Sequence, residues 1–371
     1  MKIASITPHY FEMPLAQPIA DARNTIRTRA CVLVEVKTDS GLTGWGEAAS
    51  FAGCGRLVST VINFYAERFV GRTLVDPKNL FDEMYGSSLH FGRRGLVVNA
   101  LSGIDVALWD LKAQQEGRPL ADLLGRQRDS VQAYFNGGYY VDDDPHGFVR
   151  QSAMRTCEHG VGALKIKIGR SVDDDQRRIA IAREVLGPDR DLMVDANGIL
   201  GLDYLKALDP ILQGHAIRWM EEPVAIGRLA DLLAVRDVLT TPIAGYELEQ
   251  TASGWADLIE SGAIDIAQPD AIWSGGITEC QRTFSVAAKH QVEWVPHNFA
   301  TIVCLAANAH LACAAPTGGW LEVDSNQNPF LWNLNSEGSF GLSEGRITLP
   351  DLPGLGVRPD LSAIEKFRVT V

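Results

Sequence analysis

The order of apolar and polar positions divides the chain into two parts. In the first 125 residues, Cys31–Lys37 is an apolar, partly β-branched run, and a second run passes through Gly44–Glu47 after a Gly-containing turn. Two runs joined in this way predict a β-hairpin. Leu96–Glu116 instead repeats apolar positions at helical spacing, which predicts a helix ending at Gly117, and Gly103 within it permits close packing. The first part is therefore predicted to be an α+β unit.

From about Val131 onward, short apolar runs alternate with amphipathic helical stretches, and each run ends in polar or charged residues. There are eight such runs: Val131–Gly137, Leu164–Gly169, Leu192–Asp195, Ile217–Glu221, Ile243–Glu247, Ile264–Asp270, Val292–His297 and Trp320–Asp324. Eight strand-helix units predict a closed, TIM-type (β/α)₈ barrel. We expect residues 1–125 to form an α+β capping domain, residues 126–339 to form the barrel, and residues 340–371 to pack back on the capping domain.

Composition narrows the classes of function. The 371 residues are 46% hydrophobic and 22% charged, which excludes a disordered chain. A formal net charge of −12 argues against nucleic acid and anionic membranes as partners, and the most apolar stretch, Ile302–Ala315, is too short to cross a bilayer. The start of the chain shows no signal peptide, and the six scattered cysteines form no CxxC pair. We therefore expect reduced thiols and a cytoplasmic location.

Ionisable residues recur at the ends of these runs with a regular spacing. Asp195 follows Lys167 by 28 positions, and the next steps are 26, 26, 23, 27 and 25 positions, to Glu221, Glu247, Asp270, His297 and Glu322. Each step is about one βα unit, so successive strands deliver an ionisable residue at the same height. The C-terminal ends of barrel strands carry the chemistry of this architecture. These side chains are therefore expected to share one rim.

Three of these residues, Asp195, Glu221 and Glu247, predict a metal site. Converging carboxylates repel each other in a partly desolvated site unless a cation neutralises them. Oxygen ligands without Cys or His favour Mg²⁺. Taken singly, each residue is as well explained as a helix N-cap or a salt-bridge partner. The occurrence of all three carboxylates at matching positions on successive strands favours a metal site.

Lys165 and Lys167 lie two positions apart on one strand, so they share a face. Two neighbouring ammonium groups destabilise each other's charge, which predicts a lowered proton affinity and makes one of them a plausible base near neutral pH. The alternative is that an inward lysine is a structural ion-pair partner.

Asp270 and His297 end neighbouring runs, so the carboxylate can accept the imidazole N–H and fix its tautomer. Alone, His297 would be an ordinary polar loop residue. Strand two lies opposite strand six in an eight-stranded barrel, so the lysines and this pair should face each other across the mouth. The layout suits removal of a proton beside a carboxylate, with Mg²⁺ stabilising the enediolate. Glu322 could donate a hydrogen bond to that oxyanion if burial keeps it protonated; otherwise it is a solvated loop acid.

The ordered motifs of the chain resemble those of the enolase superfamily, specifically its mandelate racemase subgroup. They are Lys165-Ile166-Lys167, Asp195-Ala196-Asn197-Gly198, Glu221-Glu222-Pro223, Gly245-Tyr246-Glu247, Gln268-Pro269-Asp270 and Pro296-His297-Asn298. The resemblance implies a modified (β/α)₇β barrel with a capping domain and one Mg²⁺ per active site. It implies that Lys167 and His297 are the acid and base, tuned by Lys165 and Asp270. It also implies that Asp195, Glu221 and Glu247 bind the metal, and that Glu322 is an electrophilic acid.

The activity implied first by this resemblance is dehydration of an aldonic or aldaric acid to a 2-keto-3-deoxy acid. Phe91–Leu96 and Asn326–Phe330 are similar to segments of galactarolactone cycloisomerases, so a cycloisomerase is the main alternative. A racemase or epimerase of a 2-hydroxy acid, and a non-catalytic metal-binding or ligand-binding barrel, are further alternatives. Leu248 departs from the family pattern, in which Asn often follows the third metal ligand.

In this family, two flexible segments of the capping domain set specificity, which implies residues 19–28 and 49–57 here. Arg23, Asn24 and Arg27 in the first segment could meet hydroxyls or a second carboxylate, or could be solvated surface residues. Asn197 is a further candidate for substrate binding. The resemblance also implies a small-molecule carboxylate substrate and a homo-oligomer, either a dimer or an octamer.

Overall fold

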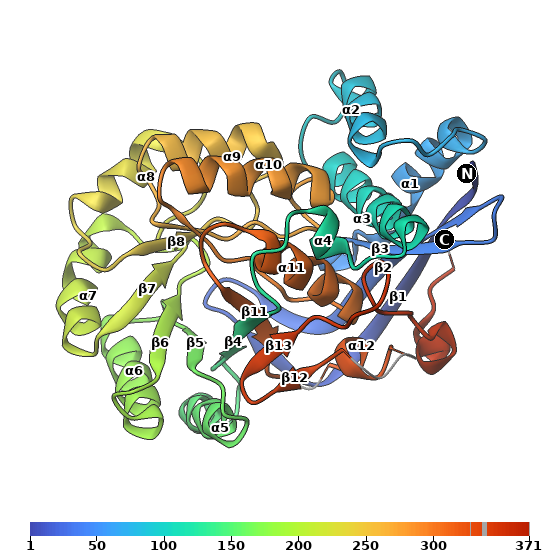
Figure 1. Cartoon of the computed structure of the whole chain (residues 1–371). Coiled ribbons are helices and arrows are strands. Elements are labelled where there is room, and N and C mark those ends of the chain that lie inside the picture. Colours follow the sequence, from blue (N-terminus) through green and yellow to red (C-terminus); the bar gives the residue numbers. More distant parts are fainter. Residues whose placement is uncertain (327, 336–339, 371) are drawn as a thin grey trace.

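The computed structural model describes residues 1–326, 328–335 and 340–370. Figure 1 shows two parts, an N-terminal sheet with its helices and a barrel ringed by helices. The elements in chain order are β1 Ile3–Ala20, β2 Thr25–Thr38, β3 Thr43–Ala48, η1 Phe51–Gly53, α1 Gly55–Phe69, α2 Pro77–Ser88, α3 Leu96–Glu116, α4 Leu120–Leu123, β4 Ser130–Gly137, α5 Pro145–Glu158, β5 Ala163–Lys167, α6 Val172–Leu186, β6 Asp191–Asp195, α7 Leu202–Gly214, β7 Ile217–Glu221, α8 Leu229–Arg236, β8 Ile243–Gly245, α9 Thr251–Glu260, β9 Ile266–Ala267, α10 Gly276–Lys289, β10 Glu293–Trp294, α11 Ile302–Ala314, β11 Trp320–Asp324, α12 Pro329–Trp332, β12 Leu342–Ser343, β13 Arg346–Thr348 and η2 Leu361–Phe367.

The N-terminal sheet has the strand order β1-β2-β3 and is antiparallel throughout. The predicted hairpin of β2 and β3 is confirmed, with Val32–Lys37 paired to Thr43–Ala48. The pattern did not predict β1, although it is the longest strand at 18 residues. Its three prolines (Pro8, Pro14 and Pro18) and mixed burial hide the strand signal, and an edge strand tolerates proline.

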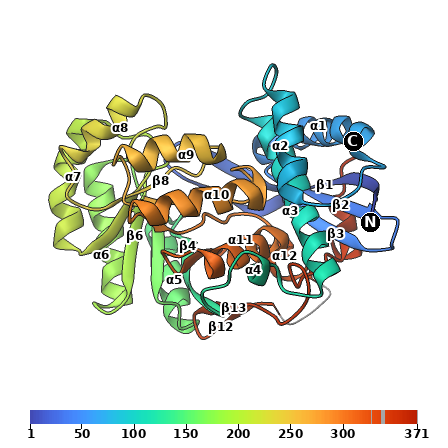
Figure 2. The same ribbon diagram turned by 45° about the horizontal axis from the view of Figure 1, so that its top comes forward.

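Helix α3 packs closely on this sheet, and Figure 2 shows α1, α2 and α3 gathered on the same side of the molecule as β1–β3. The helix has the predicted bounds and ends at Gly117, whose φ of 63° is left-handed. The predicted close packing at Gly103 is confirmed. A Cβ atom on Gly103 would lie 2.9 Å from the Cβ of Ala48, and one on Gly46 would lie 2.0 Å from the carbonyl oxygen of Gly103.

Eight parallel strands form the barrel, in the order β10-β9-β8-β7-β6-β5-β4, with β11 paired to β4. One apolar cluster takes a residue from the strand or strand end of all eight units: Tyr134, Ala163, Met193, Trp219, Ala244, Ile266, Val295 and Trp320. Among the described residues, no backbone hydrogen bonds pair β10 with β11. The side chains of the apolar cluster instead connect these two strands across the interior of the barrel. The predicted barrel class is confirmed.

Three of the barrel strands, β8, β9 and β10, are shorter than the runs that predicted them, whereas β11 has the bounds of its run. The hydrogen-bonded parts of β8, β9 and β10 have 3, 2 and 2 residues. Glu247, Asp270 and His297, the last residues of the three runs, follow the ends of these strands. Their side chains therefore emerge at the rim of the barrel.

The C-terminal segment contacts both parts of the chain. Strand β13 pairs with β4, so residues 342–348 extend the barrel sheet. Further along, the Leu120 N–H donates to the Gly354 carbonyl and the Val369 N–H donates to the Tyr10 carbonyl, which returns the chain to the N-terminal part. Residues 336–339, beside the expected boundary at 339, lie outside the described residues. The division into residues 1–125, 126–339 and 340–371 remains our proposal.

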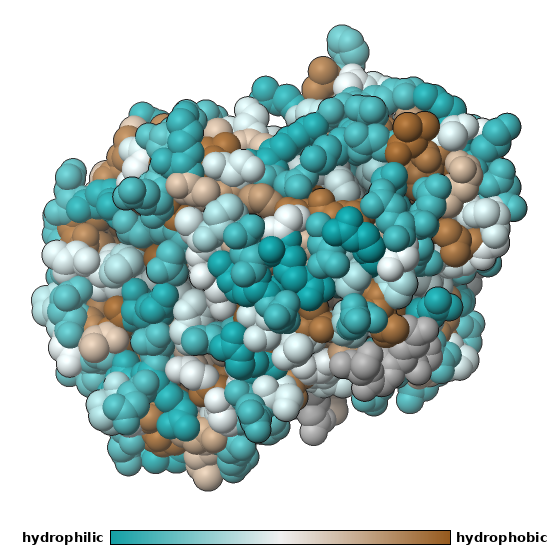
Figure 3. Space-filling view, in the orientation of Figure 1, coloured by the Kyte–Doolittle hydropathy of each residue, from teal (hydrophilic) through white to brown (hydrophobic). Residues whose placement is uncertain are grey.

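Hydrophilic residues cover most of the face seen in Figure 3, with scattered apolar residues between them. Within the described part of the chain, no helix combines the length and the apolar character needed to cross a membrane.

Candidate active site

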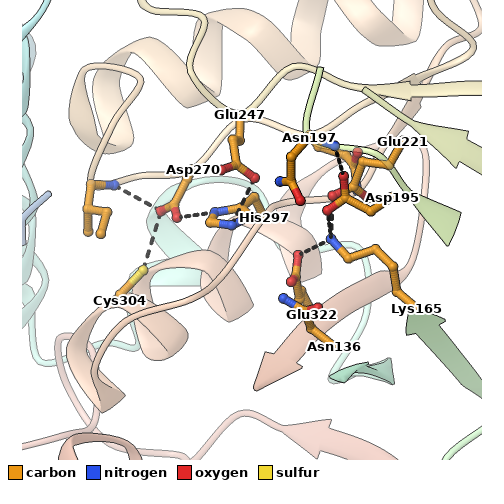
Figure 4. Close-up of polar contacts among 12 residues, drawn as sticks. Asn136, Lys165, Asp195, Asn197, Glu221, Glu247, Asp270, His297, Cys304 and Glu322 are labelled. Carbon is orange, nitrogen blue, oxygen red and sulfur yellow. Dashed lines mark hydrogen bonds and ion pairs between the residues drawn. The ribbon is translucent and has the colours of Figure 1, made fainter. Parts of the chain in front are cut away.

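The C-terminal ends of the barrel strands bring the predicted ionisable residues together. The register of β5 and β6 sets Lys167 beside Asp195, and that of β6 and β7 sets Asp195 beside Glu221. Glu247, Asp270 and His297 follow β8, β9 and β10, and Glu322 lies within β11. Figure 4 shows the side chains of the strand ends that it labels gathered in one region, with His297 and Lys165 on different sides of it.

Lysine–carboxylate pairs fill one side of this region. The Lys165 ammonium donates hydrogen bonds to Glu221 and, at 3.2 Å, to Glu322 Oε2. Lys167 Nζ lies 2.5 Å from Asp195 Oδ2. All five side chains are buried. Both lysines are therefore ion-pair partners in this arrangement, which was the structural alternative for them.

The expected lowering of the lysine proton affinity is wrong for this arrangement. Burial is the largest single effect and lowers the pKa of Lys167, but the charges of Asp195, Tyr139 and Glu221 together outweigh it, and the net pKa lies above its ordinary value. Lys165 lowers the pKa of Lys167 as the sequence argument proposed, yet by less than Asp195 raises it. Burial also lowers the pKa of Lys165, and Glu221 and Glu322 raise it above its ordinary value. The neighbouring carboxylates therefore determine the direction of the pKa shift of both lysines.

His297 is held by carboxylates at both ring nitrogens. Nδ1 lies 2.9 Å from Asp270 Oδ2, and Nε2 lies 3.0 Å from Glu247 Oε2. Burial lowers the pKa of His297, whereas Glu247, Glu322 and Asp270 raise it, and the result is about 10. The ring is therefore hydrogen-bonded to Asp270 through Nδ1 and paired with Glu247 at Nε2, and both carboxylates favour its protonated form.

Asp270 is itself fixed on the side away from His297. Its Oδ1 accepts the backbone N–H of Ile272 at 3.1 Å, the Asn308 side-chain N–H at 3.0 Å and the Cys304 thiol at 3.3 Å. These donors leave Oδ2 for the imidazole. Hydrogen bonds of this kind fix the orientation of a catalytic histidine.

A cavity of about 380 Å³ opens above these residues. The predicted site residues that line it are Arg23, Asn24, Arg27, Lys167, Asn197, Glu247 and His297. The other five, Lys165, Asp195, Glu221, Asp270 and Glu322, are not part of the lining and are almost fully buried. The cavity thus presents both candidate proton-transfer groups and one candidate metal ligand.

The β1–β2 hairpin covers the cavity. Residues 21–30 line it, except Ala22, so the segment expected to be a flexible loop is a strand end, a short turn and another strand. Asp21 holds the turn, because its Oδ1 accepts the backbone N–H groups of Arg23 and Asn24, each at 2.6 Å. The second expected segment, residues 49–57, contains η1 and the start of α1, and Phe51 from it lines the cavity.

Sequence reasoning missed several lining residues. Arg29, Asn136, Tyr139 and Trp273 carry no motif signal, because long-range packing alone brings them to the cavity. Glu222 has a weak signal, since it stands next to Glu221 in a motif. It adopts a left-handed φ of 42°, and burial, then Glu247, raise its pKa well above the ordinary value.

The donor set at the strand ends fits a Mg²⁺ ion by its chemistry. In the structure each of the three carboxylates contacts a basic side chain: Asp195 contacts Lys167, Glu221 contacts Lys165 and Glu247 contacts His297. Among the described residues, no three Asp, Glu, His or Cys side chains are grouped closely enough to hold a metal ion. Burial raises the pKa of Glu221 to about 7 and also raises that of Glu247, and Asp195 adds to both shifts. A divalent cation would relieve this crowding of buried negative charge.

Glu322 lies at the lysine side of the site. Its Oε2 accepts hydrogen bonds from the Tyr134 hydroxyl at 3.0 Å and from Lys165, and Oε1 is buried without a hydrogen-bond partner in the described structure. Its role as an electrophilic acid remains a proposal. The alternative of a solvated loop acid does not hold, because Glu322 is 0% exposed.

The two segments that pointed to cycloisomerases lie outside the ring of strand ends. Phe91–Leu96 joins α2 to α3, and Arg94 in it forms an ion pair with Glu249. In Asn326–Phe330, Asn326 and Asn328 donate hydrogen bonds to Asp324, whereas Gln327 lies outside the described residues.

Family models match both parts of the chain. The "Mandelate racemase / muconate lactonizing enzyme, N-terminal domain" matches residues 5–125, and the "Enolase C-terminal domain-like" family matches residues 148–363.

Curated relatives match nearly the full chain. The D-galactarolactone cycloisomerase of Agrobacterium fabrum is 36% identical, over 100% of this chain and 99% of the relative. The L-talarate/galactarate dehydratase of Salmonella typhimurium is 33% identical, over 93% of this chain and 85% of the relative.

Solved structures agree with this picture. The 3,6-anhydro-D-galactonate cycloisomerase from Zobellia galactanivorans superposes with a TM-score of 0.91 at 29% identity, covering 100% of both chains. The Salmonella typhimurium dehydratase liganded with Mg and L-lyxarohydroxamate superposes with a TM-score of 0.90 at 29% identity, covering 100% of this chain and 93% of that chain.

Proposed function

The chain belongs to the mandelate racemase subgroup of the enolase superfamily, and we propose that it removes the proton beside the carboxylate of an acid sugar with the help of Mg²⁺. The observation that carries this proposal is the lining of one cavity by Lys167, Glu247 and His297. Two proton-transfer groups on different strands and a candidate metal ligand then meet the same substrate.

The polar atoms of the cavity support a polyhydroxy substrate. Within the described structure, several lining residues have buried atoms without a hydrogen-bond partner: the donors Arg29 Nε and Trp273 Nε1, and the acceptors Asn136 Oδ1, Asn197 Oδ1 and Glu222 Oε1. A hydroxyl group both donates and accepts, so several hydroxyls satisfy such a mixed set. Leaving these atoms unpaired would be unfavourable.

The roles of the residues follow from their chemistry. A Mg²⁺ ion held by Asp195, Glu221 and Glu247 would supply positive charge to the substrate carboxylate as negative charge develops on it. One of Lys167 and His297, in its unprotonated form, accepts the C2 proton, and the other, in its protonated form, donates a proton to the departing C3 hydroxyl. The C2–H and C3–O bonds break, water leaves, and the enol tautomerises to a 2-keto-3-deoxy acid. The configuration at C2 decides which residue is the base.

A cycloisomerase is the second candidate, and an aromatic wall favours it. Phe51 stacks on Trp273 with ring centroids 5.4 Å apart and on Phe299 at 6.0 Å, and all three rings line the cavity. A flat apolar wall suits the C–H face of a sugar ring. In this reaction the ring oxygen of a lactone leaves C3 in place of water, so the mass does not change. The 36% identity to the cycloisomerase agrees with this candidate.

The experiment that tests the proposal is a screen of diastereomeric aldonates, aldarates and their lactones with Mg²⁺. We expect an acid sugar to give a semicarbazide-reactive keto acid that is lighter by one water. A lactone consumed without a change in mass would identify the cycloisomerase, and a C2 epimer without a keto product would identify a racemase or epimerase. If no compound reacts or exchanges its α-proton in D₂O, the chain is a non-catalytic binding barrel and the proposal is wrong.

The remaining expectations are also proposals. All six cysteines are free in the structure, which supports action in the reducing cytoplasm. We expect a homo-oligomer, a dimer or an octamer, and light scattering on the purified chain tests this.

A further inference from the structure

Arg29 is a buried cation in the wall of the cavity, and most of its hydrogen-bonding capacity is unused. Its side chain, on β2, is 5% exposed, and Nη2 lies 2.5 Å from Asp324 Oδ2 at the end of β11. The guanidinium carbon lies 3.8 Å from the ring centre of Phe299. Among the described residues, neither Nε nor Nη1 has a hydrogen-bond partner. One ion pair and one aromatic ring hold the guanidinium, which leaves Nε and Nη1 to bind a ligand in the cavity that Arg29 lines.

Other residues hold Asp324 in place independently of Arg29. Its Oδ1 accepts the backbone N–H of Asn326 at 3.0 Å and the Asn326 side-chain N–H at 2.7 Å. The Asp324 carboxylate is therefore held in one orientation and can fix the position of the Arg29 guanidinium. A planar guanidinium anchored in this way presents a preorganised fork of donors.

The chemistry of this fork suits a carboxylate. Arginine offers only donors and a carboxylate only acceptors, so the two pair bidentately, whereas a hydroxyl would also need an acceptor for its own proton. The net charge of the residues around Arg29 also favours a carboxylate as the ligand. Arg23, Arg27 and Arg29 line the hairpin side of the cavity against the single carboxylate of Asp21, and Asp324 lowers the excess to one positive charge. The opposite side of the site, which carries the proposed metal ligands Asp195, Glu221 and Glu247, is instead acidic.

We infer that Arg29, anchored by Asp324, binds a second carboxylate, so that the preferred substrates are dicarboxylic acid sugars (aldarates) rather than aldonates. The inference rests on the proposed function, because it assumes that the first carboxylate lies at the metal-binding end. Arg29 is then a specificity-determining residue from the capping domain.

The test compares kcat/KM for a diacid with kcat/KM for the aldonate of the same hydroxyl configuration, with galactarate and galactonate as the first pair. The wild type should prefer the diacid. Arg29→Met should lower kcat/KM for the diacid by about 100-fold and leave the aldonate nearly unchanged, because only the diacid loses a charge-assisted bidentate contact. Arg29→Lys keeps the charge and loses the fork, so it should lower the diacid value by about 10-fold. This variant decides the question if Arg29→Met does not fold. Arg72→Met, an exposed arginine of the same domain, is the matched control.

Equal losses for both substrates in the Arg29 variants would show a structural tie between the domains and overturn the inference. A wild type that prefers the aldonate would overturn it too. Calorimetric titration of the His297→Asn variant with galactarate and with galactonate separates the two proposals, because it needs no turnover. Tighter, Arg29-dependent binding of galactarate without turnover in the wild type would uphold this inference and contradict the proposed reaction.

Discussion

At the scale of single residues, His297 carries the clearest mechanistic assignment of the site. Its two nitrogens meet Asp270 and Glu247, and Asp270 is locked by three further donors. The ring is therefore fixed in orientation, and His297 lines the cavity. A residue held in this way for structural reasons alone would not need to reach the cavity.

We predict that His297→Asn lowers kcat by about 10³-fold, because a positioned general acid or base contributes on that order. Mg²⁺ affinity should remain close to that of the wild type, since the three carboxylates are kept. Steady-state kinetics and calorimetry measure the two effects. The control is His290→Asn, which changes a partly exposed histidine beside Glu260 and should leave kcat unchanged. Retained activity in His297→Asn would contradict the role of His297.

Glu221 is the proposed metal ligand whose substitution tests the acidic side of the site. Glu221→Gln keeps the size of the side chain and removes its charge, so it should weaken Mg²⁺ binding at least about tenfold. Isothermal titration calorimetry measures this, with the exposed Glu260→Gln as the matched control. An unchanged Mg²⁺ affinity would remove Glu221 from the ligand set.

The positions of the ionisable residues could be predicted because one βα unit has a nearly constant length. Their pairing could not, since the local pattern gives no distances between side chains on different strands. The lysines show the difference. Spacing placed Lys165 and Lys167 on one strand, yet the sign of the pKa shift of Lys167 depends on Asp195. Arg29 was missed for the same reason, because its partner Asp324 stands 295 positions away.

At the scale of elements, the contact of β3 with α3 depends on glycine. A Cβ on Gly46 would lie 2.0 Å from Gly103 O and 2.9 Å from Ala107 N. Both are backbone atoms, so neither can turn aside. The sheet and helix would have to separate to admit even one methyl group.

Gly46→Ala should therefore destabilise the fold by about 3 kcal/mol, the upper part of the range for overpacking. Gly86→Ala, in α2, is the control, since a Cβ there meets nothing within 4 Å. It should be neutral or stabilising by up to about 1 kcal/mol. Urea unfolding of the two variants measures both effects, and equal stabilities would refute the close-packing argument.

Helix α11 is tied to neighbouring segments by a buried neutral histidine. His310 Nδ1 accepts the Ala121 N–H at 3.0 Å, and Nε2 lies 3.1 Å from the Leu355 carbonyl to which it donates. Burial lowers the pKa of His310 to about 4. The unfolded chain takes up a proton near pH 6.5, so between about pH 6.5 and pH 4 the unfolded state binds more protons. The contribution of His310 to stability is lost as the pH falls through this window.

His310→Gln should remove this pH dependence. The difference in free energy of unfolding between wild type and variant should shrink by about 2 kcal/mol from pH 7 to pH 5, because the wild type alone pays for keeping this ring neutral. Chemical denaturation at pH 5, 6 and 7 measures the difference, with the exposed His90→Gln as control. A pH-independent difference for His310→Gln would show that the ring is not held neutral.

Elements with strong periodicity could be predicted, and those shaped by tertiary contacts could not. Helix α3 has its predicted bounds because a long apolar repeat and Gly117 mark both its body and its end. Strand β1 carries three prolines and becomes a strand through pairing with β2 along Ile3–Ala20. The hairpin tip likewise gains its structure from Asp21 and from the strands on either side.

At the scale of the whole molecule, the site is built from both parts of the chain. The barrel supplies the ionisable residues, and the β1–β2 hairpin covers them and adds three arginines to the cavity. The buried Arg29–Asp324 pair crosses this boundary. The barrel could be predicted by counting strand-helix units. The cavity could not, because it depends on how the N-terminal sheet sits on the barrel, and no local pattern encodes that contact.

The measurement that tests the central claim most directly follows the α-proton of the acid sugar by ¹H NMR in D₂O, with Mg²⁺ and with excess chelator. We predict that the C2 proton signal disappears, by exchange or by conversion, only when Mg²⁺ and wild-type protein are both present. We also predict that the keto acid formed carries deuterium at C3. A product that forms while the original C2 proton is kept, or at the same rate in chelator, would contradict Mg²⁺-assisted proton removal between Lys167 and His297.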